Sequence, residues 1–278
     1  MNIIYLIEII TQNGICGFLV GMLMGMTGIG GGVVIQPILI LMMGLSPVSS
    51  VGTGLLFIMV TNSVGAITHI KMRNIRPRRT LLFLCGSVPG VLIVPFAANW
   101  FITQYGPATI NRFLQNGIAL VMLTTATFML LQHIFLKKNM ETEAQVYCRG
   151  GPFPLRKKLA TIASGSVIGT LIGATSIGGG VLIIPVMLWL NASIAEAVGS
   201  SLVIALLLSG LGSLVYLFEG HIQLQTVATL ALGSIPGVIL GSRLTRRIPE
   251  RILLIIIVFL VAVSGTCLLV NSLYFARP

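Results

Sequence analysis

Two matching stretches decide the architecture of this chain: Gly25-Met-Thr-Gly-Ile-Gly-Gly-Gly-Val-Val-Ile-Gln-Pro37 and Gly173-Ala-Thr-Ser-Ile-Gly-Gly-Gly-Val-Leu-Ile-Ile-Pro185. They are offset by 148 residues (173 minus 25). Two further pairs match at an offset of 147 (198 minus 51): Val51–Leu55 with Val198–Leu202, and Gly86–Val91 with Gly233–Val238. A nearly constant offset over this distance indicates that a whole half of the chain is duplicated.

The composition predicts a membrane protein. Of the 278 residues, 55% are hydrophobic and only 8% are charged, and the mean hydropathy is +1.02. A soluble domain has about 25% charged residues. Several apolar runs reach the roughly 20 residues that a bilayer-spanning helix needs. The runs lack the alternation of a membrane barrel, so helices are the remaining way to satisfy the backbone in lipid.

Each half contains five apolar segments. Those of the first half cover residues 14–27, 31–44, 51–70, 80–98 and 113–136, and those of the second half cover 159–175, 179–191, 197–218, 225–242 and 252–273. The fold class predicted is therefore an all-α polytopic membrane protein with two repeats. Each repeat has a short glycine-broken helix pair and three spanning helices, which makes about eight to ten transmembrane segments. The first segment would span if residues 3–13 extended it.

The division predicted is a first membrane repeat at residues 1–136, a basic cytoplasmic loop at 137–158 and a second membrane repeat at 159–278. The net charge is +11, and 15 of the 17 Lys and Arg residues fall in segments 71–79, 137–158 and 243–251. Such clustering marks cytoplasmic loops and argues against a nucleic-acid-binding face. The first and third of these segments, 71–79 and 243–251, each have a counterpart in the other half, and both counterparts are nearly free of Lys and Arg. We therefore expect inverted repeats in a bacterial inner membrane, with both termini extracytoplasmic.

The glycine-rich motifs are the candidate substrate site. Consecutive glycines unwind a helix and expose its backbone, and the N-terminus of the helix that follows attracts anions without a basic side chain. Inverted repeats can bring two such ends to one substrate near the bilayer midplane. The predicted contacts are Thr27, Gly28, Gly30, Gly31, Gly32, Thr175, Ser176, Gly178, Gly179 and Gly180.

Other small and polar residues have competing interpretations. Six glycines recur every four residues, a spacing that favours helix packing over substrate contact: Gly17, Gly21, Gly25, Gly165, Gly169 and Gly173. The third segment of each half carries polar residues that either line a path or bond between helices: Thr53, Thr61, Asn62, Ser63, Ser200, Ser201 and Ser209. Asn62 is the sharper candidate for substrate binding, because an amide is costly to bury unused. Kinks or hinges are expected at Pro37, Pro89, Pro185 and Pro236.

The residues that are missing also inform the function. No Asp or Glu lies in the middle of an apolar segment, although proton-driven and sodium-driven carriers usually need one there. The four cysteines are scattered, and no nucleophile–base pair or metal cluster appears, so we expect neither an enzyme nor a cofactor nor a metal. An inside-negative potential expels anions by about 2.3 kcal/mol per charge per 100 mV. Export of an anion therefore needs no coupling carboxylate.

The paired G-x-GGG-x-x-x-x-P motifs, Gly28 to Pro37 and Ser176 to Pro185, resemble those of the TauE/SafE family of sulfite-exporter-like permeases. The resemblance covers essentially the whole chain and implies export of sulfite or a related sulfur-containing or organosulfonate anion. Two departures from symmetry could tune the substrate: Ser176 replaces the first motif glycine, and Gln36 is matched by Ile184. An anion channel and a non-transporting scaffold or assembly protein are the alternatives. The expected partners are the lipid bilayer and a small anion, and the sequence is compatible with a homo-oligomer.

Overall fold

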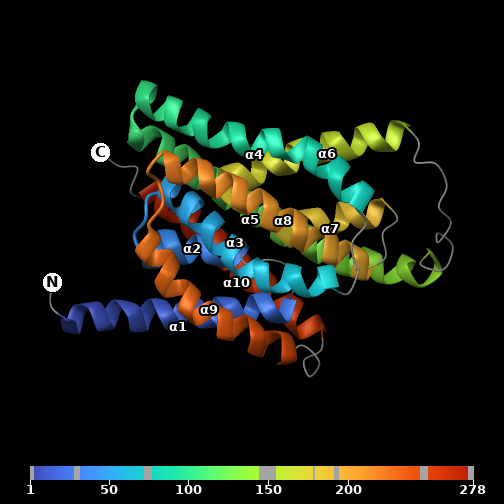
Figure 1. Cartoon of the computed structure of the whole chain (residues 1–278), viewed down its shortest axis with the longest axis horizontal. Coiled ribbons are helices and arrows are strands. Elements are labelled where there is room, and N and C mark those ends of the chain that lie inside the picture. Colours follow the sequence, from blue (N-terminus) through green and yellow to red (C-terminus); the bar gives the residue numbers. More distant parts are fainter. Residues whose placement is uncertain are drawn as a thin grey trace.

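The structure, a computed structural model, describes residues 3–27, 32–71, 77–143, 155–177, 179–190, 194–244 and 250–274. These parts of the chain are helical, with short connections (Figure 1). The helices in order are α1 (Ile3–Thr27), α2 (Gly32–Pro37), the π-helical η1 (Ile38–Met42), α3 (Pro47–Lys71), α4 (Pro77–Tyr105), α5 (Pro107–Glu143), α6 (Leu155–Thr175), α7 (Gly179–Trp189), α8 (Ile194–Phe218), α9 (Leu224–Leu244) and α10 (Glu250–Tyr274).

Each predicted apolar segment is helical, with α2 and η1 together covering segment 31–44, so the prediction of an all-helical polytopic protein is confirmed. Within the described residues, five helices are long and apolar enough to cross a membrane: Pro77–Tyr105, Pro107–Leu131, Leu155–Thr175, Glu196–Phe218 and Leu224–Leu244. Shorter apolar helices cover Gly32–Met42, Gly179–Trp189 and Val258–Ser272.

Helix α1 joins residues 3–13 to the first apolar segment, the extension under which that segment was expected to span, whereas the prediction that the first segment of the second half is short was wrong. Helix α1 has 25 residues and α6 has 21, which corresponds to about 37 and 31 Å at 1.5 Å per residue. Residues N-terminal to the apolar run continue each helix, including the basic stretch at the start of α6. The second member of each glycine-flanking pair remains short: α7 has 11 residues, and α2 and η1 have six and five.

Proline and glycine set several helix boundaries. Pro47, Pro77 and Pro107 are the first residues of α3, α4 and α5, where the missing proline N–H would have no partner inside the helix. Gly106 follows α4 with a φ of 81°, and Gly220 follows α8 with a φ of 74°. A side chain would strain the backbone at either glycine, so these turns are well specified by the sequence.

The main helix contacts cross between the halves. Helix α1 packs along α9, α4 packs along α6, α3 packs on α8, and α5 packs on α10. The first helix of one half therefore lies against the fourth helix of the other. Figure 1 shows α1 beside α9 at one edge of the molecule and α4 beside α6 at the opposite edge.

The glycines spaced by four residues make these contacts, which confirms the prediction that they serve packing. A Cβ added to Gly21 would lie 2.6 Å from Ser234 Cα, and one added to Gly169 would lie 2.6 Å from Ser87 Cα. The backbone partners advance in the same direction as the glycines, so both pairs are parallel. They are Gly17 with Leu230, Gly21 with Ser234, Gly25 with Val238, Gly165 with Phe83, Gly169 with Ser87 and Gly173 with Val91.

Both termini lie at one end of the bundle in Figure 1, together with the turns between α4 and α5 and between α8 and α9. The helix ends that adjoin the three basic segments lie at the opposite end. Near the first of these ends, Trp100 and Tyr105 on α4 are 57% and 63% exposed. Exposed aromatic rings at a helix end are typical of the membrane–water interface.

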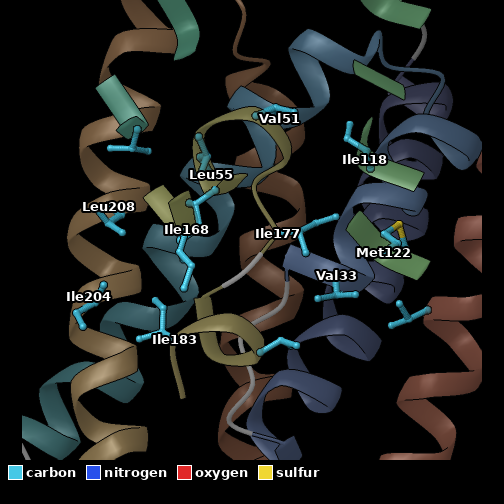
Figure 2. Packing of buried hydrophobic residues seen from close by; sticks show 14 of the residues in the cluster. Val33, Val51, Leu55, Ile118, Met122, Ile168, Ile177, Ile183, Ile204 and Leu208 are labelled. Carbon is cyan, nitrogen blue, oxygen red and sulfur yellow. The ribbon is translucent and has the colours of Figure 1, made fainter. Parts of the chain in front are cut away.

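The core lies between α3 and α8, the third helices of the two halves, and the short helices α2 and α7. Figure 2 shows Ile177, which follows α6, between Leu55 of α3 and Met122 of α5, with Val33 of α2 nearby. These side chains are buried, as is Ile183 of α7. The segments that contain the glycine motifs are therefore at the centre of the molecule.

Candidate functional site

The two glycine motifs meet in the interior. Helix α1 ends at Thr27 and α2 begins at Gly32, while α6 ends at Thr175 and α7 begins at Gly179. A Cβ added to Gly32 would lie 3.1 Å from the carbonyl carbon of Ser176, and still closer to its oxygen. Glycine at position 32 thus lets the backbones of the two motifs touch. The predicted contacts Gly28, Gly30, Gly31 and Gly178, and the side chain of Thr27, lie outside the described residues.

Ser176 has an unusual backbone conformation at this junction. Its φ is +52°, in the left-handed region, and the residue is buried. Its N–H donates to Ile172 O at 2.7 Å and so completes the C-terminal turn of α6. Thr175 Oγ1 donates to Leu171 O and accepts the N–H of Ile177 at 3.2 Å. The Thr175 hydroxyl therefore supports the turn in this structure.

Gln36, on α2, joins the two halves through its side-chain amide. Gln36 Nε2 donates to Ser176 Oγ, and it also donates to Ser50 O at 3.1 Å. Ser50 Oγ donates to Gln36 Oε1 at 2.9 Å. All three residues are buried. Gly54 leaves room for this cluster, because a Cβ there would lie 2.7 Å from Gln36 Nε2 and 2.9 Å from Ser176 Oγ.

Asn62 is buried, and its side-chain nitrogen has no hydrogen-bond partner among the described residues. The residue is 4% exposed, and Nδ2 makes no hydrogen bond to the described residues. Ile58, four residues earlier on the same face of α3, would lie 3.1 Å from a Cβ on Gly32. Asn62 therefore lies one helical turn from the point where α3 contacts the glycine motif.

Most other hydroxyl groups on the third helices bond within their own helix. Thr61 Oγ1 donates to Phe57 O, Ser63 Oγ to Val60 O, Ser201 Oγ to Val198 O and Ser209 Oγ to Leu206 O. Thr53 differs from these, since its Oγ1 accepts the N–H of Gln223 at 3.1 Å, and the Ser50 hydroxyl reaches Gln36 as described above. Most of these hydroxyls therefore neither line a path nor bond between helices, since they bond within their own helix. Asn62 is the member of this polar set that remains a candidate for substrate binding.

Tyr216, on α8, braces the end of α6. Its hydroxyl donates to Gly173 O at 3.0 Å, and its ring is fully buried. The carbonyls in the last turn of a helix receive no N–H from within the helix. The Tyr216 hydroxyl therefore supplies Gly173 O with a donor that it would otherwise lack. A Cβ on Gly52 would lie 2.8 Å from Tyr216 Cβ, which shows how closely α3 passes.

Two apolar cavities lie outside this junction. One, of about 190 Å³, lies between α2–η1 and α10 and is lined by residues including Val33, Pro37 and Val261. The other, of about 400 Å³, lies along α1 and α9. Neither contains Thr175, Ser176 or Asn62, and their apolar walls do not suit an anion.

The four prolines predicted to kink or hinge their helices lie within helical elements. Pro37 is the last residue of α2 and immediately precedes the π-helical turn η1. Pro89, Pro185 and Pro236 lie inside α4, α7 and α9. A proline inside a helix removes one hydrogen bond, so local bending at these residues stays a prediction.

Several features of the site were not predicted from the sequence. The roles of Gly54 and Tyr216 carry no recognisable signal in a single sequence, and Ser50 was not singled out although its repeat equivalent is Ala197. Gln36 and Ser176 did carry one, because each departs from the residue at the equivalent position of the other half. Their meeting in one hydrogen bond requires the three-dimensional arrangement.

Comparisons with known proteins agree with this description. The profile of the family described as Sulfite exporter TauE/SafE matches residues 14–268. The probable membrane transporter protein YjnA of Bacillus subtilis is 30% identical over 251 residues, covering 90% of this chain and 95% of that protein. From the same organism, the probable membrane transporter proteins YunE and YdhB are 25% and 26% identical, covering 94% and 91% of this chain and 97% of each relative. No solved structure gives a significant match.

Proposed function

The chain belongs to the TauE/SafE family of membrane transporters, and on this premise we propose that it exports a small anion, sulfite or a related sulfur-containing or organosulfonate anion. The family consists of transporters and not of enzymes. The proposed membrane is the bacterial inner membrane, with both termini on the extracytoplasmic side. The basic helix ends then face the cytoplasm, as the positive-inside rule requires.

The observation that carries the proposal is the buried side-chain nitrogen of Asn62, which has no hydrogen-bond partner among the described residues. A buried amide nitrogen without an acceptor costs about 1–3 kcal/mol. An oxyanion at the junction of the glycine motifs would supply that acceptor, because Asn62 lies one turn from the Ile58–Gly32 contact. A purely structural role gives no reason to keep this cost.

The backbone around the junction supplies the rest of the electrostatics. Helix α7 starts at Gly179 and Gly180, so its first N–H groups have no partners within the helix and carry the positive end of the helix dipole. Glycine adds no side chain that would keep a ligand away. Neutral donors of this kind hold an anion without a fixed cation and release it more readily than an ion pair would.

The partner exchange between the halves supports inverted repeats. Gly17, Gly21 and Gly25 on α1 meet α9, and their equivalents Gly165, Gly169 and Gly173 on α6 meet α4 at the equivalent residues. A two-fold axis in the membrane plane would produce this reciprocal packing. Since each tight pair joins helices of both halves, opening of the junction would move α1 with α9 and α4 with α6, rather than separate one half from the other.

Flux measurements in proteoliposomes test the proposed function. Efflux of sulfite, thiosulfate and sulfoacetate is measured for the natural protein and for Asn62→Leu, a variant with the same branching and number of side-chain heavy atoms that lacks the amide. Ser209→Ala is the matched control, because Ser209 is the equivalent residue on α8 and bonds only within its helix among the described contacts. We expect Asn62→Leu to lose most of the flux and Ser209→Ala to keep it.

The same experiment separates the rival functions. Flux that saturates with anion concentration indicates a carrier, and flux that stays proportional indicates a channel. Absence of flux for every anion, from protein shown to be folded and inserted, would refute the proposal in favour of a scaffold.

A further inference from the structure

Three departures from the internal repeat come together at one point. Gln36, Ser50 and Ser176 correspond by the repeat offsets to Ile184, Ala197 and Gly28. In each pair, the member in the cluster is polar and its equivalent is apolar or lacks a side chain. The first two come from the first half and Ser176 from the second, so the cluster exists only where the halves meet.

Ser50 determines which way the Gln36 amide points. The main-chain carbonyl of Ser50 can only accept, and it lies 3.1 Å from the side-chain nitrogen of Gln36. The Ser50 hydroxyl lies 2.9 Å from Gln36 Oε1 and 2.8 Å from Pro47 O, and its single hydrogen holds the Gln36 oxygen on the other side when it is donated to Oε1. The second amide hydrogen is therefore directed to Ser176 Oγ, at the junction of the glycine motifs.

Ser176 occupies a position that glycine would fill with less strain. A non-glycine residue at positive φ costs of order 1 kcal/mol or more and usually persists for a functional reason. In return, its hydroxyl oxygen is placed where it accepts the Gln36 amide. Because that oxygen accepts, its own hydrogen is left to donate elsewhere at the junction.

We infer that Gln36 is a specificity-determining residue that donates a hydrogen bond to an oxygen of the transported oxyanion, with Ser50 as its positioning residue. In the structure described here, Ser176 Oγ takes the place of that substrate oxygen. When the anion enters, the Ser176 hydroxyl turns and donates to it beside the Gln36 amide. This inference rests on the proposed function and extends it to two residues outside the glycine motifs.

The cluster also restricts the substrate class. Two neutral donors from a side-chain amide and a hydroxyl fit an oxygen-bearing acceptor, whereas a halide has no directional acceptor geometry to match. We therefore expect the cluster to favour oxyanions of sulfur over chloride of equal charge. The buried position of Gln36, which is 0% exposed, strengthens each such bond because water does not compete.

Three substitutions taken from the other half test this inference: Gln36→Ile, Ser50→Ala and Ser176→Gly. Initial rates of sulfite and chloride flux in proteoliposomes give KM and kcat, and sulfite-induced thermal stabilisation of the purified protein gives binding independently. Gln36→Ile should raise the KM for sulfite by about tenfold to a hundredfold, the effect of a hydrogen bond to a charged group, with little change for chloride. Ser50→Ala should raise it less, and Ser50→Thr, which keeps the hydroxyl, should restore it.

Ser176→Gly separates a substrate role from a structural one. Glycine relieves the strain at φ +52°, so the variant should fold at least as well as the natural protein, yet its KM for sulfite should rise severalfold. An unchanged ratio of sulfite to chloride KM in both Gln36→Ile and Ser176→Gly, with normal flux, would overturn the inference and leave the proposed function standing. Absence of sulfite flux and of sulfite binding in the natural protein would overturn both.

Discussion

Replacing Gly21 by alanine should separate α1 from α9. The added Cβ would lie 2.6 Å from Ser234 Cα, whereas ordinary contact begins near 3.4 Å. The two helix backbones must therefore move apart by at least about 0.8 Å, the difference between these distances, because the Ser234 carbonyl oxygen lies nearer still. Because the obstacle is backbone and not a flexible side chain, we expect a cost near the upper end of the overpacking range, about 3 kcal/mol.

Thermal unfolding in detergent measures this effect. For a protein of this size, each kcal/mol lowers Tm by about 2–4 °C, so Gly21→Ala should unfold about 6–12 °C lower than the natural protein. Gly14→Ala is the matched control on the same helix, since a Cβ there meets nothing within 4 Å. Alanine favours a helix over glycine by about 0.5–1 kcal/mol, so the control should unfold at the same temperature or slightly higher.

The equivalent change in the other half provides a second check. A Cβ on Gly169 would lie 2.6 Å from Ser87 Cα, so Gly169→Ala should lower Tm by a similar amount. A Gly21→Ala protein that unfolds at the temperature of Gly14→Ala would show that the α1–α9 contact is looser than described. The claim that the two halves are held together by close packing of α1 on α9 and of α6 on α4 would then fail.

Three further changes have defined outcomes. Asn62→Leu removes an unsatisfied buried amide and should raise Tm by several degrees while flux falls, and a lower Tm would show that the amide has a structural partner. Tyr216→Phe removes the bond to Gly173 O and should cost about 0.5–1.5 kcal/mol, measured as a lower Tm, with the ring still packed; an unchanged Tm would show that the hydroxyl does not brace α6. Single cysteines introduced in residues 71–79 and 243–251 should both react with a thiol reagent only from the cytoplasmic side, and labelling from opposite sides would disprove the inverted arrangement.

Hydrophobicity and glycine spacing allowed much of the fold to be predicted. Apolar runs mark helices because lipid leaves the backbone no other partner, and the four-residue glycine spacing marked the packing faces of α1 and α6. The extension of α1 through residues 3–13 was left open, because polar residues such as Asn13 and Thr11 interrupt its hydropathy without breaking the helix. Which helix each glycine face meets depends on distant sequence and could not be predicted from local pattern.

The candidate site was predicted only in outline. The motif glycines indicated where backbone would be exposed, and Asn62 was selected for the cost of burying an amide. The bond between Gln36 and Ser176 joins residues 140 positions apart in the chain, and only the crossing of the halves brings them together. The orientation of Gln36 by Ser50 depends on individual atoms, which a sequence pattern does not specify.

The pairing of α1 with α9 has a consequence for how the chain is made. Gly17 and its partner Leu230 are 213 positions apart (230 minus 17), and at about 5–20 residues per second a ribosome needs roughly 10–40 s to bridge that interval. Throughout that period the face of α1 with Gly17, Gly21 and Gly25 contacts lipid or the insertion machinery, because α9 has not yet been synthesised. The nascent chain must therefore tolerate an unpaired α1 until α9, the last helix but one, has been synthesised. A truncation before α9 would leave α1 permanently unpaired and should expose the fragment to quality-control proteolysis.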